Sequence, residues 1–132
     1  MQIRLLIALA SISQAHAELV PVNDLGLRIA PGFEITHYAD SVIAPDVYSM
    51  TLDPSGSVVI SSRGYIKRLT DKDGDGVADT ETILIKSSAG AMGMLFLDER
   101  TLLTTEGGYF NRYIDKNGDG KFDSKPFRIG KF

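Results

Sequence analysis

Short apolar stretches separated by turn-forming residues dominate the chain from residue 48 onward. Stretches rich in β-branched and aromatic residues, bounded by Gly, Pro, Asp and Ser, are typical of antiparallel strands. The expected strands fall in two sets of four, over residues 48–52, 58–61, 65–69 and 82–86 and then over residues 94–97, 102–105, 109–114 and 127–129. Residues 33–38 are expected to form a leading strand, and little of the sequence after residue 17 has helical periodicity.

The two sets of strands belong to an internal repeat of 44 residues. GYIKRLTDKDGDGVAD, residues 64–79, aligns without a gap with GYFNRYIDKNGDGKFD, residues 108–123, and nine of the sixteen pairs are identical. A unit of four short strands at this period is typical of a β-propeller blade. The predicted fold is therefore all-β: a partial β-propeller of two four-stranded antiparallel blades plus the leading strand.

The repeat also predicts the domain organisation. Residues 18–46 form a leading segment, residues 47–88 the first blade and residues 89–132 the second. Because stacked repeats bury their faces on one another, at least three units are usually needed for stability. Two blades alone therefore predict a partner: further propeller blades from another chain, or self-association.

Residues 1–17 have the pattern of a secretory signal peptide. Arg4 accompanies an apolar stretch over residues 3–10, and Ala15 and Ala17 give a small-x-small end. Cleavage is expected after Ala17, and the alternative is a buried N-terminal helix. No later apolar stretch is long enough to span a bilayer. These features predict a secreted or periplasmic protein without a membrane span.

Composition excludes several classes of function. The 132 residues carry a formal net charge of -3 and include no cysteine. Disulfides, thiolate metal sites and c-type haem attachment all need cysteine and are therefore excluded. The acidic balance also argues against nucleic-acid binding, which depends on clustered Lys and Arg.

The strongest candidate chemistry lies in two acidic loops, each predicted between the third and fourth strands of a blade. Residues 71–79 and 115–123 both carry acidic or amide side chains at loop positions 1, 3, 5 and 9, with glycine at position 6. Calcium takes six to eight hard oxygen ligands, and this spacing aims successive oxygens inward. The predicted ligands of two calcium ions are Asp71, Asp73, Asp75, Asp79 and the Val77 carbonyl, and Asp115, Asn117, Asp119, Asp123 and the Lys121 carbonyl.

These loops differ from an EF-hand, which needs a bidentate Glu at position 12. Thr82 and Pro126 occupy that position, and the flanking residues are expected to be strands instead of helices. Asp79 and Asp123 are then the candidate bidentate ligands, and the expected role of the ions is structural. The alternative is a pair of hairpin turns that bind nothing.

Three segments of the chain resemble a known family. APGFEITHYAD at residues 30–40, RGYIKRLTDKDGDGVADTETIL at residues 63–84 and MGMLFLDERTLLTTEGGYFNRYIDKNGDGKFD at residues 92–123 are similar to glucose/sorbosone dehydrogenase-like propellers. More narrowly, the chain resembles exported propeller domains that precede a cytochrome-c-type haem domain. The resemblance implies six blades, calcium, pyrroloquinoline quinone and a sugar ligand, because members of the broader family are quinoproteins that oxidise sugars.

The chain departs from this family in two ways. Six blades at this period need roughly 260 residues, whereas 115 remain after removal of residues 1–17. The histidine base and channel arginines of the quinoproteins have no counterpart either, so no catalytic or cofactor-binding residue is assigned. His37 is expected to be an ordinary surface or packed residue, Arg68 and Arg112 to neutralise the acidic loops, and Tyr65 and Tyr109 to pack between blades.

The favoured function is therefore an exported calcium-binding β-propeller segment, with a structural or binding role or as a truncated member without activity of its own. One alternative is a pyrroloquinoline-quinone-dependent sugar or aldose dehydrogenase subunit that acts together with the missing blades. A second is a calcium-binding β-repeat protein that stores or responds to the ion. The favoured function is not an enzyme by itself, because no base is placed for hydride abstraction.

Overall fold

The structure, a computed structural model, describes residues 18–86, 89–123 and 125–132. The predicted signal peptide, residues 1–17, lies outside them. The chain divides into two units, Met1–Ile35 and Thr36–Phe132. In the first unit, β1 (Val20–Val22) and β2 (Leu27–Ile29) form an antiparallel hairpin around the short 3-10 helix η1 (Asn23–Leu25). This hairpin was not expected from the sequence.

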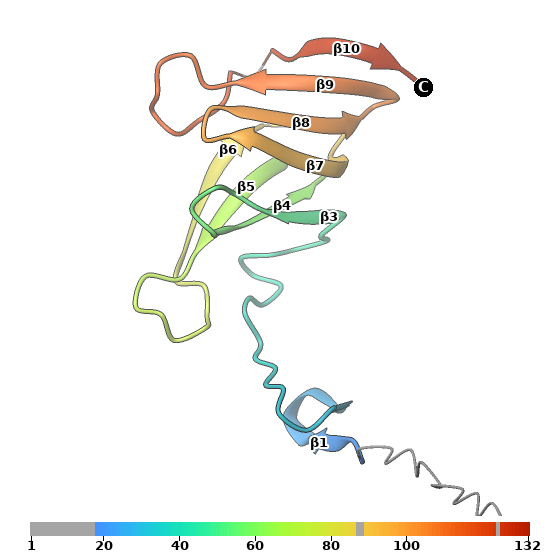
Figure 1. Cartoon of the computed structure of the whole chain (residues 1–132). Coiled ribbons are helices and arrows are strands. Elements are labelled where there is room, and N and C mark those ends of the chain that lie inside the picture. Colours follow the sequence, from blue (N-terminus) through green and yellow to red (C-terminus); the bar gives the residue numbers. More distant parts are fainter. Residues whose placement is uncertain (1–17, 87–88, 124) are drawn as a thin grey trace, which may run out of the picture. The chain divides into compact units, whose positions relative to one another are not determined.

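The second unit contains two four-stranded antiparallel sheets (Figure 1). Sheet 1 has the order β3-β4-β5-β6, and its strands are β3 (Ser49–Leu52), β4 (Val58–Ser62), β5 (Tyr65–Thr70) and β6 (Thr80–Ile85). Sheet 2 has the order β10-β9-β8-β7, and its strands are β7 (Ala91–Asp98), β8 (Thr101–Glu106), β9 (Tyr109–Ile114) and β10 (Phe127–Lys131). The prediction of an all-β chain with two four-stranded antiparallel units is confirmed. The described residues form no closed propeller.

The main core lies between the two sheets. Val59, Ile66 and Leu84 of sheet 1 are fully or almost fully buried against Leu102 and Tyr113 of sheet 2. Burial of aliphatic side chains stabilises such contacts by about 1.5 to 3 kcal/mol each. The two sheets therefore stabilise each other, and β3 lies beside β7 where they meet (Figure 1).

A second, smaller core covers the other face of sheet 1. Ile60 and Leu69 are buried there beneath a segment that is not a strand, residues 38–46, which we call the cover segment. Its Tyr38, Ile43 and Ala44 side chains pack against this core. Because both faces of sheet 1 are covered, consecutive residues of β4 are buried, whereas a strand with one covered face would alternate.

The expected strand over residues 33–38 is absent from the structure. A strand needs a neighbour that pairs with its N–H and C=O groups, and no sheet of the described residues offers one to this segment. The Tyr38 carbonyl instead accepts a single hydrogen bond from the Ala78 N–H, at 2.8 Å. The prediction of a strand over residues 33–38 is therefore wrong.

The two repeated tyrosines also differ from expectation, since neither packs between the sheets. Tyr65 packs on the second core, and its hydroxyl donates to the Pro45 carbonyl in the cover segment. Tyr109 lies under the guanidinium of Arg128, 3.9 Å from its ring centre. Among the described residues no helix is long and apolar enough to cross a membrane.

Candidate metal site and the two acidic loops

Both acidic loops lie where the sequence placed them, between the third and fourth strands of a sheet. Residues 71–79 connect β5 to β6, and residues 115–123 connect β9 to β10. Each loop extends beyond the end of its sheet (Figure 1). The flanking elements are strands, which agrees with the rejection of an EF-hand.

In the first loop, backbone hydrogen bonds fix the turn around the first carboxylate. Asp71 Oδ1 accepts from the Gly74 N–H at 2.7 Å, and Oδ2 accepts from the Gly76 N–H at 2.9 Å. Gly74 and Gly76 have φ of 78° and 85°, a left-handed conformation that side chains with Cβ rarely adopt. The Gly76 hydrogen bond is the main cause that lowers the pKa of Asp71 below its ordinary value. Asp71 therefore stays ionised at neutral pH.

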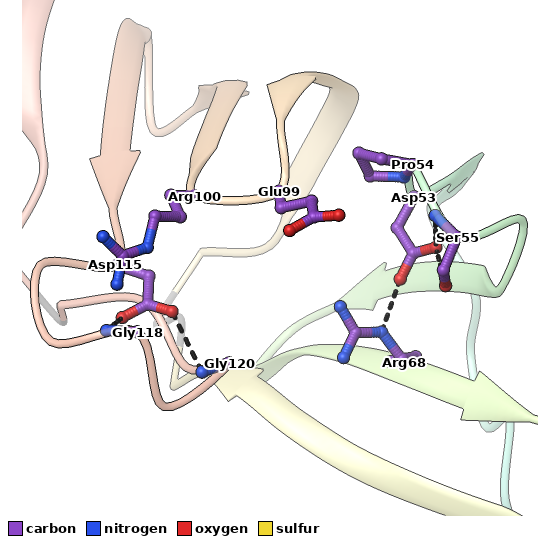
Figure 2. Close-up of a pocket in the computed structure, with 9 residues that line it drawn as sticks. All are labelled: Asp53, Pro54, Ser55, Arg68, Glu99, Arg100, Asp115, Gly118 and Gly120. Carbon is purple, nitrogen blue, oxygen red and sulfur yellow. Dashed lines mark hydrogen bonds and ion pairs between the residues drawn. The ribbon is translucent and has the colours of Figure 1, made fainter.

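The second loop repeats this turn in detail. Asp115 Oδ1 accepts from Gly118 at 2.7 Å, and Oδ2 accepts from Gly120 at 2.9 Å, as the dashed lines in Figure 2 show. Asp119 Oδ1 accepts from the Lys121 N–H at 2.8 Å, and this hydrogen bond is the main cause that lowers the pKa of Asp119. The two loops therefore share the same backbone turn.

Three predicted ligands come together in the first loop. One carboxylate oxygen from each of Asp71, Asp73 and Asp79 lies within 4.8 Å of the other two. Each oxygen has two lone pairs, so an oxygen that accepts one backbone hydrogen bond can still bind a cation. Three carboxylates at this spacing could hold a metal ion, and the group is largely open to solvent.

The other two predicted ligands of this loop lie outside that group. Asp75 is exposed, and its Oδ1 accepts from the Val77 N–H at 2.8 Å. The Val77 side chain is 44% exposed. The expected contribution of the Asp75 carboxylate and the Val77 carbonyl to the site stays a prediction.

In the second loop, side-chain groups as well as backbone N–H groups contact the predicted ligands. The Lys116 ammonium lies 3.2 Å from Asp123 Oδ2, and the Asn117 amide donates to Asp119 Oδ2 at 3.0 Å. Among the residues that the structure describes, a cluster of three carboxylates occurs in the first loop and not in the second. The sequence pattern gave no indication of the Lys116 contact.

The expectation that Arg68 neutralises an acidic loop is wrong. Its Nε atom donates to Asp53 Oδ2 at 2.5 Å, in the turn between β3 and β4. Burial alone would raise the pKa of Asp53, but hydrogen bonds from Ser55 and Ser57 together with the Arg68 guanidinium lower it. The sequence alone does not reveal this pair, because Asp53 and Arg68 meet only when β3, β4 and β5 pair in register.

Arg112 occupies the same repeat position as Arg68, but within residues 18–86, 89–123 and 125–132 it forms no ion pair with a carboxylate. Its guanidinium carbon lies 5.2 Å from the centre of the Phe127 ring. Its Nε atom is buried and lacks a hydrogen-bond partner among the described residues. The expectation that this arginine neutralises the second loop is therefore wrong.

A polar pocket of about 240 Å³ lies between the sheets, next to the second loop (Figure 2). Asp53 and Arg68 line it from sheet 1, and Glu99, Arg100 and Asp115 line it from sheet 2. Arg100 lies directly over the second loop, because a Cβ on Gly118 would come within 2.0 Å of its Nη2 atom. The pocket therefore brings cationic and anionic groups to the boundary of the two sheets.

The described residues do not fit pyrroloquinoline quinone, the cofactor that the family resemblance implies. His37 lines a different pocket, together with the apolar residues Val42, Ile43 and Val77. Arg68 lines the pocket between the sheets, which shares no residue with that of His37. A histidine base and arginines that converge on one cavity are thus not found in this part of the chain.

Comparisons with known proteins place the chain in a family without an assigned function. No curated protein matches the sequence. A structure described as a Trichoderma reesei carbohydrate-active enzyme of family AA12 is similar, with a TM-score of 0.53 and 19% sequence identity. That match covers 63% of this chain and 23% of the enzyme chain, so this chain spans about a quarter of its length. Residues 26–129 match the family described as "Domain of unknown function (DUF7133)", and the chain belongs to that family.

Proposed function

We propose that the chain is an exported, calcium-binding segment of a β-propeller, in which the ion has a structural role. The observation that carries this proposal is the group of three carboxylates, Asp71, Asp73 and Asp79, whose oxygens lie within 4.8 Å of one another. The blades are residues 47–88 and 89–132, preceded by the leading segment 18–46 and a signal peptide over residues 1–17.

Calcium fits this group better than magnesium. The first loop offers only oxygen donors, and the ion can complete a coordination number of six to eight with loop carbonyls and water. Magnesium demands a smaller, near-octahedral site and keeps most of its waters. An exposed loop with three converging carboxylates therefore favours calcium.

The structural role follows from what the first loop touches. The Ala78 N–H donates to the Tyr38 carbonyl at 2.8 Å, and this hydrogen bond ties loop position 8 to the cover segment. Ala78 is itself part of the second core, with Ile60 and Leu69. An ion that holds residues 71–79 in one conformation would therefore also hold the cover segment on sheet 1.

The second loop is proposed as the weaker of two calcium sites. Its carboxylates are already engaged by Lys116 and by the amide of Asn117. Calcium would have to compete with the Lys116 ammonium for the Asp123 carboxylate. Exposed ion pairs of this kind contribute about 0.2 to 1 kcal/mol, so the competition weakens the site without abolishing it.

Calorimetric titration of the purified chain with calcium tests the proposal. We expect binding with a Kd of about 10⁻⁴ to 10⁻³ M, the range of extracellular calcium modules. Asp79→Asn keeps the size of the side chain but removes its charge, and it should weaken binding at least about tenfold. Glu34→Gln, which changes an exposed carboxylate of the first unit, is the matched control and should have no effect. No binding at millimolar calcium, or equal binding by Asp79→Asn, would contradict the proposal.

A second candidate is that the chain is one part of a carbohydrate-active enzyme. The fold match to the family AA12 enzyme favours it, although the chain spans only 23% of that protein. Activity would then need further blades, either in another chain or through self-association, and quinone and sugar would bind to the complete assembly. An aldose oxidation assay with pyrroloquinoline quinone, calcium and an artificial electron acceptor tests it, and we expect no turnover by this chain alone.

A further inference from the structure

One face of sheet 2 is open, whereas the repeat-related face of sheet 1 is covered around Val59 and Ile66. Leu103 pairs with Leu95 and Arg112, and Thr105 pairs with Phe110, so these side chains share one face. We call Leu95, Leu103, Phe110 and Arg112 the outer face of sheet 2. Leu95 is 56% exposed, and a hollow of about 210 Å³ lies over Leu103 and Phe110.

The repeat shows what covers this face in sheet 1. Val59 and Ile66 occupy the positions of Leu103 and Phe110, and both have 0% exposure. Their cover is provided by aromatic and aliphatic side chains from the facing side of sheet 2: Met94, Phe96, Leu102, Tyr113 and Phe122. The outer face of sheet 2 is at least as apolar as its counterpart, because Leu95 stands at the position of Thr51.

Arg112 gives independent evidence that this face has a partner. Arg68 donates its Nε hydrogen to Asp53, but the position of Asp53 is occupied by Leu97 in sheet 2. The Nε atom of Arg112 is consequently buried without an acceptor among the described residues. Burying a donor of a charged group unpaired is costly. Because Leu97 offers no acceptor at the position of Asp53, a carboxylate that pairs with the Arg112 guanidinium would come from outside sheet 2.

The pocket between the sheets indicates where such an acceptor would lie. Glu99, in the turn between β7 and β8, points into the same pocket as Arg68 of the preceding sheet (Figure 2). If a third sheet follows sheet 2 as sheet 2 follows sheet 1, its corresponding turn lies next to Arg112. A carboxylate in that turn would meet the unpaired guanidinium.

We propose that the outer face of sheet 2 binds a third four-stranded antiparallel sheet of the same repeat, which brings a carboxylate from its first hairpin turn to Arg112. This rests on the proposed propeller architecture and identifies the partner of one of its faces. A second copy of the chain fits less well, because the outward face of its sheet 1 already lies beneath its own cover segment, with Tyr38 and Ile43 packed on Ile60 and Leu69.

Extending the chain by one repeat tests the proposal. A second copy of residues 89–132 is appended after Phe132, which keeps the period of 44 residues. The chain has no cysteine, so Leu103→Cys in the original repeat introduces a single thiol. We expect the third sheet to slow thiol labelling at that position at least about tenfold. Thr82→Cys, on an exposed position of β6, is the control and should label equally fast in both chains.

Arg112→Met provides a second test that does not depend on folding of the extension. In the original chain it removes a buried, unpaired donor while keeping an apolar contact with Phe127, so the melting temperature should stay equal or rise. In the extended chain the same change should lower the melting temperature, because it removes the new ion pair.

Three results would overturn the proposal. The first is unchanged labelling of Leu103→Cys in a folded extended chain, and the second is a lower melting temperature of Arg112→Met in the original chain. The third is protection of Leu103→Cys that rises with the concentration of the original chain, which would identify a second copy as the partner. Calcium binding by the first loop is independent of all three, so calorimetry on the same proteins separates this proposal from the proposed calcium site.

Discussion

The two repeats build the same sheet and the same loop backbone but differ in the chemistry that the loops can support. Residues 71–79 and 115–123 share their turn, with the first aspartate accepting hydrogen bonds of 2.7 and 2.9 Å from two glycines in each loop. In the first loop three carboxylates converge, whereas in the second Lys116 and Asn117 occupy the carboxylate oxygens. Loop shape is therefore a property of the repeat, whereas the grouping of three carboxylates occurs in the first of the two loops.

The two loops are also anchored to different parts of the chain. The N–H at loop position 8 donates to a backbone carbonyl in each case, from Ala78 to Tyr38 and from Phe122 to Leu84. Tyr38 belongs to the cover segment, whereas Leu84 belongs to β6 in the sheet before it. Through this hydrogen bond the second loop is tied to a neighbouring sheet, and the first is tied to a segment without strand pairing. This difference makes the first loop the one whose order should depend more on an ion.

The largest expected effect concerns the ion pair of Asp53 and Arg68, which has no counterpart among the described residues of the second repeat. Asp53→Ala leaves the Arg68 guanidinium and the N–H groups of Ser55 and Ser57 without their acceptor. Removal of one partner of a buried pair costs about 3 kcal/mol or more. Urea unfolding should show this loss in the free energy of unfolding. Leu97→Ala, at the same repeat position and 58% exposed, should cost less than about 1 kcal/mol; equal costs would contradict the asserted difference between the repeats.

Exchanging the residues at loop position 3 should lower the calcium affinity of the first loop and raise that of the second. Asp73→Asn removes one of the three converging carboxylates of the first loop and should weaken its calcium binding about tenfold, or about 1.4 kcal/mol. Asn117→Asp adds a carboxylate to the second loop and should strengthen that site by a similar factor. Calorimetry of both variants checks this pair of changes. Changes of the same sign would argue against an oxygen-ligand role for this position.

Removing the lysine that competes in the second loop should have a smaller effect. Lys116→Gln frees Asp123 from an exposed ion pair and should raise calcium affinity at that loop about twofold to fivefold. The gain should shrink at high ionic strength, because salt screens exposed pairs. Lys72→Gln, the repeat-related change in the first loop, is the control. If both variants gain equally, a general charge effect and not the Asp123 contact is responsible.

Acidification should have the smallest effect on the calcium affinity of the first loop near neutral pH. Hydrogen bonds lower the pKa of Asp71 below that of the unfolded chain, so the stability it contributes is fully present above the unfolded pKa. That contribution disappears as the pH falls through the folded pKa, and protonation also removes a cation ligand. Calcium affinity of the first loop should therefore be constant from about pH 8 to 6 and fall steeply below about pH 4. Loss of calcium affinity already near neutral pH would contradict binding by these carboxylates.

The repeat made much of this structure predictable from the sequence. Glycines that require a left-handed backbone and aspartates that accept from them act within a few residues, so the loop turns followed from local pattern. Contacts between distant residues could not be predicted from local pattern. The pair of Asp53 and Arg68, for example, needs three strands in register. The segment at residues 33–38 shows the same limit, because strand formation depends on a neighbour that no local pattern reveals.

Titration of the isotope-labelled chain with calcium, followed by backbone amide NMR, tests the central claim most directly. Gly76 and Gly120 occupy the same loop position and donate to Asp71 and Asp115, so their amide signals report separately on the two loops. We expect the Gly76 signal to shift first, at calcium concentrations about tenfold below those that move Gly120. Movement of Gly120 first, or no movement of Gly76 at millimolar calcium, would contradict the assignment of the first loop as the metal site.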